Sequence, residues 1–213
     1  MILSEPPVQH PFTTMKVVWL SGLSDPATCA LSAKQERFLD ALDVPHESKI
    51  YWNFPYVPST QAPREVPLWL ASLRNAHQFI SASRPAYRNA ARRHWRALAD
   101  STDALFVITG SCGLEILNHC IDETDADRIV RVIALGPVAR TRPNVPCTLV
   151  RGTNDPISKF YFPDCDVVLH GAGHMSYLDD PRVVQLVNQI VSEIVCSNTF
   201  PSSAPASICR SAS

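Results

Sequence analysis

The sequence predicts an α/β fold with a mostly parallel central sheet and helices on both of its faces. Three observations indicate this. Short apolar runs rich in β-branched residues recur along the chain, and segments with helical spacing of apolar residues lie between them. The runs are apolar throughout rather than alternating with polar residues, which is typical of strands covered on both faces.

The first half of the chain begins with KVVWL at 16–20, a predicted buried strand that ends in a Ser-Gly-Leu-Ser loop. Apolar residues at helical spacing predict a helix over 33–42, and 48–54 has the composition of a second strand. Four prolines in 54–67 exclude a helix or a central strand there. Two helices are then predicted, over 68–81 and 85–98.

The second half alternates strand and helix more regularly. ALFVIT at 104–109 is a predicted strand and 114–120 has helical spacing, so the GSCG sequence between them is a tight strand-to-helix turn. The remaining elements are predicted strands at 129–135, 147–150 and 167–169 and a closing helix at 181–195.

The 213 residues fit one domain, which we expect to span 15–196. Residues 1–14 are expected to form a flexible N-terminal segment. Residues 197–213, rich in Ser, Ala and Pro, are expected to form a disordered C-terminal tail.

The overall charge excludes some classes of partner. Nineteen basic residues against 20 acidic ones give a net charge of −1, so neither nucleic acid nor a membrane surface is expected as a partner. The basic run RNAARRHWR at 88–96 is expected to be a solvated helix face. Residues 1–14 lack the features of a secretory signal, and no apolar run approaches the ~20 residues that span a bilayer, which predicts a cytoplasmic protein. The seven cysteines form no CxxC pair, so they are expected to be reduced thiols rather than zinc ligands.

The sequence TGSCG holds the candidate nucleophile. On a strand-turn-helix elbow, the residues two before and two after the nucleophile must be small because the chain folds back tightly. With Ser111 as nucleophile these flanks are Thr109 and Gly113, whereas with Cys112 the second flank is the bulky Leu114. Ser111 is therefore favoured over Cys112. A plain turn in which the serine caps the helix is the alternative.

Two further residues follow predicted strands. Asp155 lies in GTNDP, just past the strand at 147–150, and His174 lies in the glycine-containing loop HGAGHMSYL before the last helix. Either one alone has an ordinary explanation, since Asp-Pro is a common turn and isolated histidines are common. The order Ser, Asp, His along the chain favours a catalytic triad.

These three motifs together resemble the nucleophile elbow, acid loop and histidine loop of the α/β-hydrolase superfamily, and the resemblance covers residues 15–195. It implies that Ser111 is the nucleophile, Asp155 the acid and His174 the base. It also implies an oxyanion hole made by the backbone N–H groups of Cys112 and Leu23. The chain departs from the family at Thr109, where the family usually has glycine.

The resemblance implies a serine hydrolase that cleaves an ester, thioester or lactone of a small acyl group, free or bound to a carrier, through an acyl-enzyme on Ser111. Such chemistry requires no metal or organic cofactor. Two alternatives use the same scaffold: an acyltransferase with the same triad, and a non-catalytic protein that binds acyl ligands. A cysteine-dependent hydrolase similar to dienelactone hydrolase is a third, against which Leu114 argues.

The substrate pocket is expected to lack a cap domain, because only 11 residues separate the strands at 129–135 and 147–150. The extra length lies between 53 and 103 instead. We expect Gly22 and the aromatic residues at the start of that segment to line an open, shallow pocket, although core packing explains the aromatics equally well. These aromatic residues are Trp52, Phe54 and Tyr56.

Overall fold

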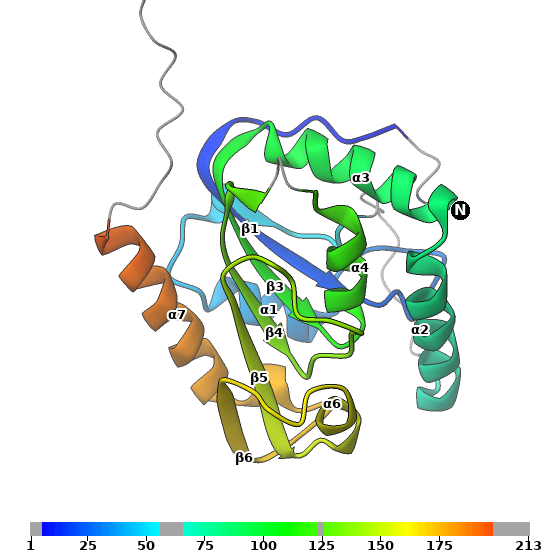
Figure 1. Cartoon of the computed structure of the whole chain (residues 1–213). Helices are drawn as coiled ribbons and strands as arrows, with labels where there is room; N and C mark the ends of the chain where they lie inside the picture. Colours follow the sequence, from blue (N-terminus) through cyan, green and yellow to red (C-terminus); the bar gives the residue numbers. More distant parts are fainter. Residues whose placement is uncertain (1–5, 56–65, 123–125, 198–213) are drawn as a thin grey trace, which may run out of the picture.

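The computed structural model describes residues 6–55, 66–122 and 126–197. Six strands form one sheet in the order β2-β1-β3-β4-β5-β6, and every neighbouring pair is parallel (Figure 1). The predicted α/β class with a parallel sheet is therefore confirmed. The strands are β1 (Thr13–Ser21), β2 (Lys49–Ile50), β3 (Thr102–Gly110), β4 (Ile129–Leu135), β5 (Cys147–Asn154) and β6 (Val167–Gly173).

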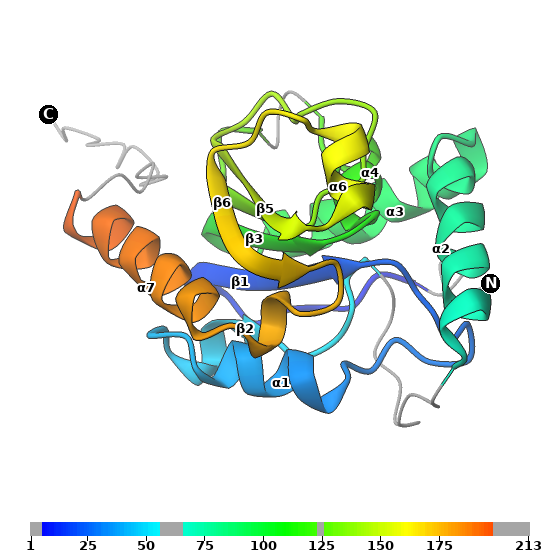
Figure 2. The same cartoon turned by 90° about the horizontal axis from the view of Figure 1, so that it is seen from below.

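Helices cover both faces of the sheet. Along β1, Val18 points into a core shared with α3 and α4, whereas its neighbour Val17 points into a second core shared with α1 and α7. Figure 2 shows these two pairs of helices on opposite sides of the strands. Because both faces are buried, the strands are apolar throughout. The helices are α1 (Ala33–Asp40), α2 (Leu68–Ala82), α3 (Pro85–Ala99), α4 (Gly113–Cys120), α6 (Pro156–Tyr161) and α7 (Pro181–Cys196), with short 3₁₀ turns at His46–Ser48 and Tyr177–Asp179.

Helix α2 lies outside both layers and is attached largely by polar contacts. Arg74 donates to the carbonyl oxygen of Ser24 at 2.7 Å, and the Gln78 amide contacts both backbone groups of Leu23. Several of its large apolar side chains remain in solvent, including Trp69 at 66% exposure. The helix is therefore fixed to the loop after β1, next to the carboxyl ends of the strands.

The first half of the chain departs from the sequence prediction in two places. Only Lys49–Ile50 of the predicted strand at 48–54 pairs with β1, and Trp52 instead makes an isolated antiparallel bridge to Ala30. The strand β1 begins at Thr13, and His10 stacks on Trp52 with 5.6 Å between ring centroids. The strand thus starts two residues before the expected domain boundary at residue 15.

The second half agrees more closely with the prediction. Eleven residues join β4 to β5, so the absence of a cap at this point is confirmed. Helix α6 and the 3₁₀ turn at Tyr177–Asp179 are described elements that the sequence did not predict. Helix α6 begins at Pro156. The Asp155 side chain caps its N-terminus by accepting from the Ser158 N–H. The expected C-terminal tail lies outside the described residues from 198 onward.

Candidate active site

Ser111 occupies a strained turn between β3 and α4. Its φ of 52° is in the left-handed region that side-chain-bearing residues seldom adopt. Two hydrogen bonds hold the turn: Ser111 N donates to the Leu135 oxygen, and Val138 N donates to the Ser111 oxygen, both at 3.1 Å. The neighbouring β4 end and the loop after it therefore fix the serine above the carboxyl edge of the sheet.

The residues that flank Ser111 show why the turn needs small side chains. A Cβ on Gly113 would lie 2.0 Å from the carbonyl oxygen of Leu20, so α4 could not pack against β1 with any other residue there. Thr109, on the other side, is fully buried, and its hydroxyl has no hydrogen-bond partner among the described residues. The departure from glycine at this position is thus accommodated at the cost of an unpaired hydroxyl.

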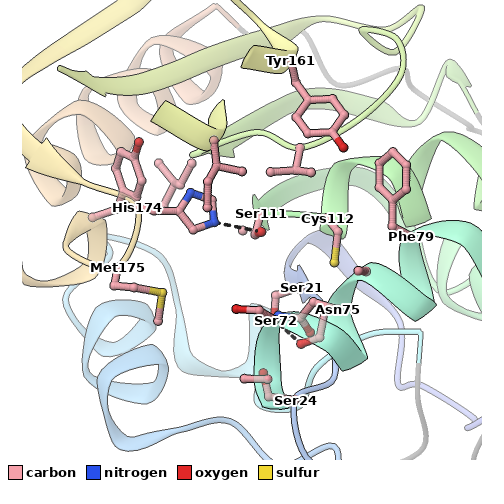
Figure 3. Close-up of a pocket in the computed structure, with 18 of the residues that line it drawn as sticks. Ser21, Ser24, Ser72, Asn75, Phe79, Ser111, Cys112, Tyr161, His174 and Met175 are labelled. Carbon is pink, nitrogen blue, oxygen red and sulfur yellow. Dashed lines mark hydrogen bonds between the residues drawn. The ribbon is translucent and has the colours of Figure 1, made fainter. Parts of the chain in front are cut away.

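The three predicted catalytic side chains meet at the carboxyl ends of β3, β5 and β6. Ser111 Oγ lies 3.0 Å from His174 Nε2 (Figure 3). His174 Nδ1 lies 2.9 Å from Asp155 Oδ2. An ionised Asp155 can only accept, so Nδ1 carries the proton and Nε2 is free to accept from the serine. The arrangement is a chain of hydrogen bonds from hydroxyl to carboxylate.

Asp155 is completely buried and fully hydrogen bonded. Its Oδ2 also accepts from the Tyr177 hydroxyl at 2.6 Å, and its Oδ1 accepts from the Ser158 N–H at 3.0 Å. Burial alone would raise the pKa of this carboxyl, but the hydrogen bonds from His174, Tyr177 and Ser158 outweigh it and hold the pKa below its usual value. The acid therefore stays ionised, as an orienting carboxylate must.

Cys112 follows Ser111 but does not share its chemistry. The cysteine is 2% exposed, and burial raises the pKa of its thiol to about 12, so the reactive thiolate does not form near neutral pH. His174 contacts the serine instead. The Cys112 backbone N–H, at the start of α4, donates to no backbone oxygen among the described residues, and it lies against the sulfur of its own side chain, as the Gly22 N–H does.

The second predicted oxyanion donor, Leu23, is not free. Its N–H donates to Gln78 Oε1 at 2.5 Å, and Leu23 does not line the cavity at Ser111. The expectation that this N–H faces the substrate is therefore corrected, because α2 supplies an acceptor for it. Gly22, by contrast, lines the cavity as predicted.

A cavity of about 740 Å³ opens onto Ser111 and His174. Such a volume is within the range of small-molecule sites, roughly 300–1,000 Å³. Three of its apolar side chains, Ile80, Ile157 and Met175, are still about half or more exposed at its mouth. The walls come from α2 (Ala71, Ser72, Asn75, Ala76, Phe79 and Ile80), from α6 (Ile157 and Tyr161), and from the loops at the ends of β1, β4 and β6.

The aromatic residues predicted to line this cavity do not do so. Phe54 is 2% exposed and packs edge to face on Trp95 in the core, 5.7 Å between centroids. Trp52 stacks on His10, away from Ser111. Tyr56 lies outside the described residues. The aromatic residues that line the cavity are instead Trp19, Phe79, Tyr161 and Tyr177, and the ring centroids of Phe79 and Tyr161 are 5.6 Å apart.

The sequence does contain a pattern that predicts the position of Tyr161, a cavity residue that the sequence analysis did not identify. Asp-Pro at 155–156 is a helix start, with a capping residue followed by proline at the first position, and would have predicted α6 and its wall residue Tyr161. Tyr177 and Phe79 carry no such signal, because their positions depend on tertiary packing.

No protein-family model matches the chain, and no curated protein matches it in sequence. Solved structures do. The mouse α/β hydrolase domain-containing protein 10 superposes with a TM-score of 0.50 at 11% identity, over 87% of this chain and 91% of that one. The chain has an α/β-hydrolase fold.

Two other structures align similarly. A putative α/β hydrolase of unknown function from Agrobacterium tumefaciens gives a TM-score of 0.49 at 11% identity, over 94% of this chain and 93% of its own. Esterase PE8 gives 0.48 at 15% identity, over 89% and 96%.

Neither a membrane span nor a metal cluster is found in the described part of this α/β-hydrolase fold. No helix there is long and apolar enough to cross a bilayer. No group of three or more His, Cys, Asp or Glu side chains in the same residues is placed to hold a metal ion.

Proposed function

We propose that the chain is a serine hydrolase that cleaves an ester or thioester of an apolar acyl group through an acyl-enzyme on Ser111. The observation that supports this most directly is the hydrogen-bonded series from Ser111 through His174 to the buried Asp155. Each of the three lies within hydrogen-bond distance of the next, which the proposed roles require.

The first half of the reaction forms the acyl-enzyme. His174 Nε2 takes the proton from Ser111 Oγ as the oxygen adds to the acyl carbonyl, and the carbonyl π electrons move onto its oxygen. Asp155 stabilises the imidazolium that results. When the intermediate collapses, the bond to the leaving group breaks, and His174 gives its proton to the departing alcohol or thiol.

Water completes the cycle. A water molecule gives a proton to His174 Nε2 as it adds to the acyl-enzyme carbonyl, and collapse releases the carboxylic acid and returns the proton to Ser111. In this proposal the backbone N–H of Cys112, at the start of α4, stabilises the negative oxygen in both halves. The apolar cavity walls favour an acyl group without charge, and carrier-bound acyl groups remain within the same proposal.

Labelling with a fluorophosphonate probe, followed by peptide mass spectrometry, tests the nucleophile. Wild type and Cys112→Ala are expected to carry the label on Ser111, because the variant keeps the backbone N–H, and Ser111→Ala is expected to carry none. Label that persists in Ser111→Ala contradicts the assignment.

p-Nitrophenyl esters of increasing chain length then test the reaction. Turnover that rises with chain length is expected from the apolar cavity. Binding of such an ester with neither turnover nor labelling would favour a non-catalytic acyl-binding protein, and acyl transfer to an added alcohol or amine in preference to water would favour an acyltransferase. Asp155→Asn should lower kcat by about 10⁴-fold, as the wrong histidine tautomer is then favoured.

A further inference from the structure

The active site lacks the second oxyanion donor that its loop was expected to supply. Two backbone N–H groups after β1 are close to Ser111. That of Leu23 is bonded to Gln78, and that of Gly22 points to the Cys112 sulfur. The Cys112 N–H alone would leave the negative oxygen of the tetrahedral intermediate with a single donor.

Asn75 on α2 lies directly beside this gap. It lines the cavity together with Ser111, and Figure 3 shows its side chain near Ser21 on the side of the cavity toward α2. A Cβ built on Gly22 would lie 2.4 Å from Asn75 Oδ1 and 2.7 Å from Cys112 Sγ. The absence of a side chain at Gly22 thus leaves the space that the amide fills, next to the residue that follows the nucleophile.

The hydrogen-bonding state of this amide is unusual. Asn75 Oδ1 is buried without a hydrogen-bond partner in the described part of the chain, whereas its NH₂ group is not among the buried atoms that lack a partner. The oxygen is the end packed against Gly22, where the neighbouring Cys112 thiol stays protonated, so the NH₂ end is left for the cavity. The NH₂ group is the donor end of the amide, and a ligand oxygen in the cavity is the kind of group that accepts from it.

We propose that the Asn75 side-chain amide is a catalytic residue that, with the Cys112 N–H, hydrogen bonds to the substrate carbonyl oxygen as Ser111 adds to it. The proposal rests on the hydrolase function proposed above. The oxyanion hole then has one backbone donor and one side-chain donor, and the second is carried by α2 rather than by the loop after β1. Helix α2 thereby contributes to the chemistry as well as to the cavity wall.

Three variants test the proposal against p-nitrophenyl ester hydrolysis. Asn75→Ala and the similarly sized Asn75→Asp are both expected to lower kcat by about 10²- to 10³-fold with little change in KM, because the donor acts on charge that develops in the transition state. Gln78→Ala is the matched control: it removes an amide from the same helix face that contacts the same loop, but no donor to the substrate. It is expected to keep kcat within a few-fold of wild type.

A second measurement separates a donor from a merely structural residue. A trifluoromethyl ketone forms a hemiketal oxyanion with the serine, so its affinity should fall in Asn75→Ala by about the same factor as kcat/KM, while the affinity for the carboxylic acid product stays the same. Thermal unfolding of each variant checks that the fold is retained.

Distinct results overturn the proposal at distinct points. An unchanged kcat in Asn75→Asp, or equal losses in Asn75→Ala and Gln78→Ala, would exclude the amide as a donor. A gain in kcat in Gln78→Ala with no loss in Asn75→Ala would assign the donor to the released Leu23 N–H. If the wild-type protein neither hydrolyses esters nor is labelled at Ser111, both the hydrolase function and the role of Asn75 are wrong. If the wild-type protein is labelled and the Asn75 variants remain fully active, only the role of Asn75 is wrong.

Discussion

Replacement of Tyr177 by phenylalanine would remove two buried hydrogen bonds and leave the ring in place. The hydroxyl donates to Asp155 Oδ2 at 2.6 Å and accepts from the Gly152 N–H at 2.8 Å. Tyr177 is 4% exposed and Asp155 fully buried, so water cannot replace either partner easily. A hydrogen bond to a charged group contributes about 1.5–3 kcal/mol, and a buried N–H left unpaired costs about 1–3 kcal/mol. Since the two effects share one hydroxyl, we expect Tyr177→Phe to lower the free energy of unfolding by about 3 kcal/mol.

Urea unfolding measures this loss, and the chain contains its own control. Tyr51 donates to Asp40 Oδ1 at the same 2.6 Å but at the protein surface. Tyr51→Phe is therefore expected to lose less than about 1 kcal/mol.

The effect of Tyr177→Phe should also depend on pH. The hydroxyl helps to hold the pKa of Asp155 below its ordinary value of 3.8. A carboxyl with a lowered pKa in the folded state stabilises the protein above its unfolded pKa, and this stabilisation is lost as the pH falls through the folded value. The difference between wild type and variant should thus be largest at about pH 7 and shrink towards about pH 3, leaving the share due to the Gly152 N–H. Equal losses in the two tyrosine variants, or a difference that does not shrink in acid, would refute this account of the site.

Three other variants test the elbow and its surroundings by urea unfolding. Gly113→Ala should lower the free energy of unfolding by about 3 kcal/mol or more, because the new Cβ would lie 2.0 Å from the Leu20 carbonyl oxygen. Gly173→Ala is the control, because its new Cβ would lie at an ordinary 3.5 Å from the nearest atom, the Asn154 carbonyl oxygen. Similar losses in the two would argue against tight packing at the elbow. Thr109→Val should raise the free energy of unfolding by about 1 kcal/mol by removing a buried, unpaired hydroxyl, and a loss would show that the hydroxyl is paired. Glu115→Ala should lower the free energy of unfolding by about 2 kcal/mol, because the buried carboxylate accepts from both the backbone and the side chain of Arg140. The Arg140 cation is half exposed and can be hydrated in the variant, so a loss above about 4 kcal/mol would contradict this reasoning.

The sequence was sufficient for the sheet and for the meeting of the three triad candidates, because both depend on local patterns. Apolar runs mark the strands, and residues that follow parallel strands meet at one edge of the sheet. Ser111, Asp155 and His174 each follow such a run, so their proximity is a consequence of topology. The need for a small residue at Gly113 could likewise be inferred from sterics alone.

The cavity could not be predicted in the same way. Its walls come from α2, and the sequence does not show which face of that helix turns toward Ser111. For the same reason the sequence could not predict that Gln78 accepts from the Leu23 N–H, because the two residues are 55 positions apart. Phe54 was misplaced for a related reason: the short segment after β2 has no periodicity that could distinguish a core side chain from a cavity side chain, and Trp95 on α3 decides the outcome.

The two oxygens of Asp155 have consequences for how new substrate selectivity could evolve or be engineered. One oxygen orients His174, while the other caps α6, which brings Ile157 and Tyr161 into the cavity wall. A substitution that removes both oxygens would therefore disturb the proposed triad and the cavity wall together. Phe79 on α2 has only one of these two roles. It lines the cavity, and it is not part of the hydrogen bonds that join Ser111, His174 and Asp155 in the described structure. Libraries that seek altered acyl preference should therefore vary Phe79 and the other apolar wall positions of α2, and leave Asn75 and the α6 junction as they are.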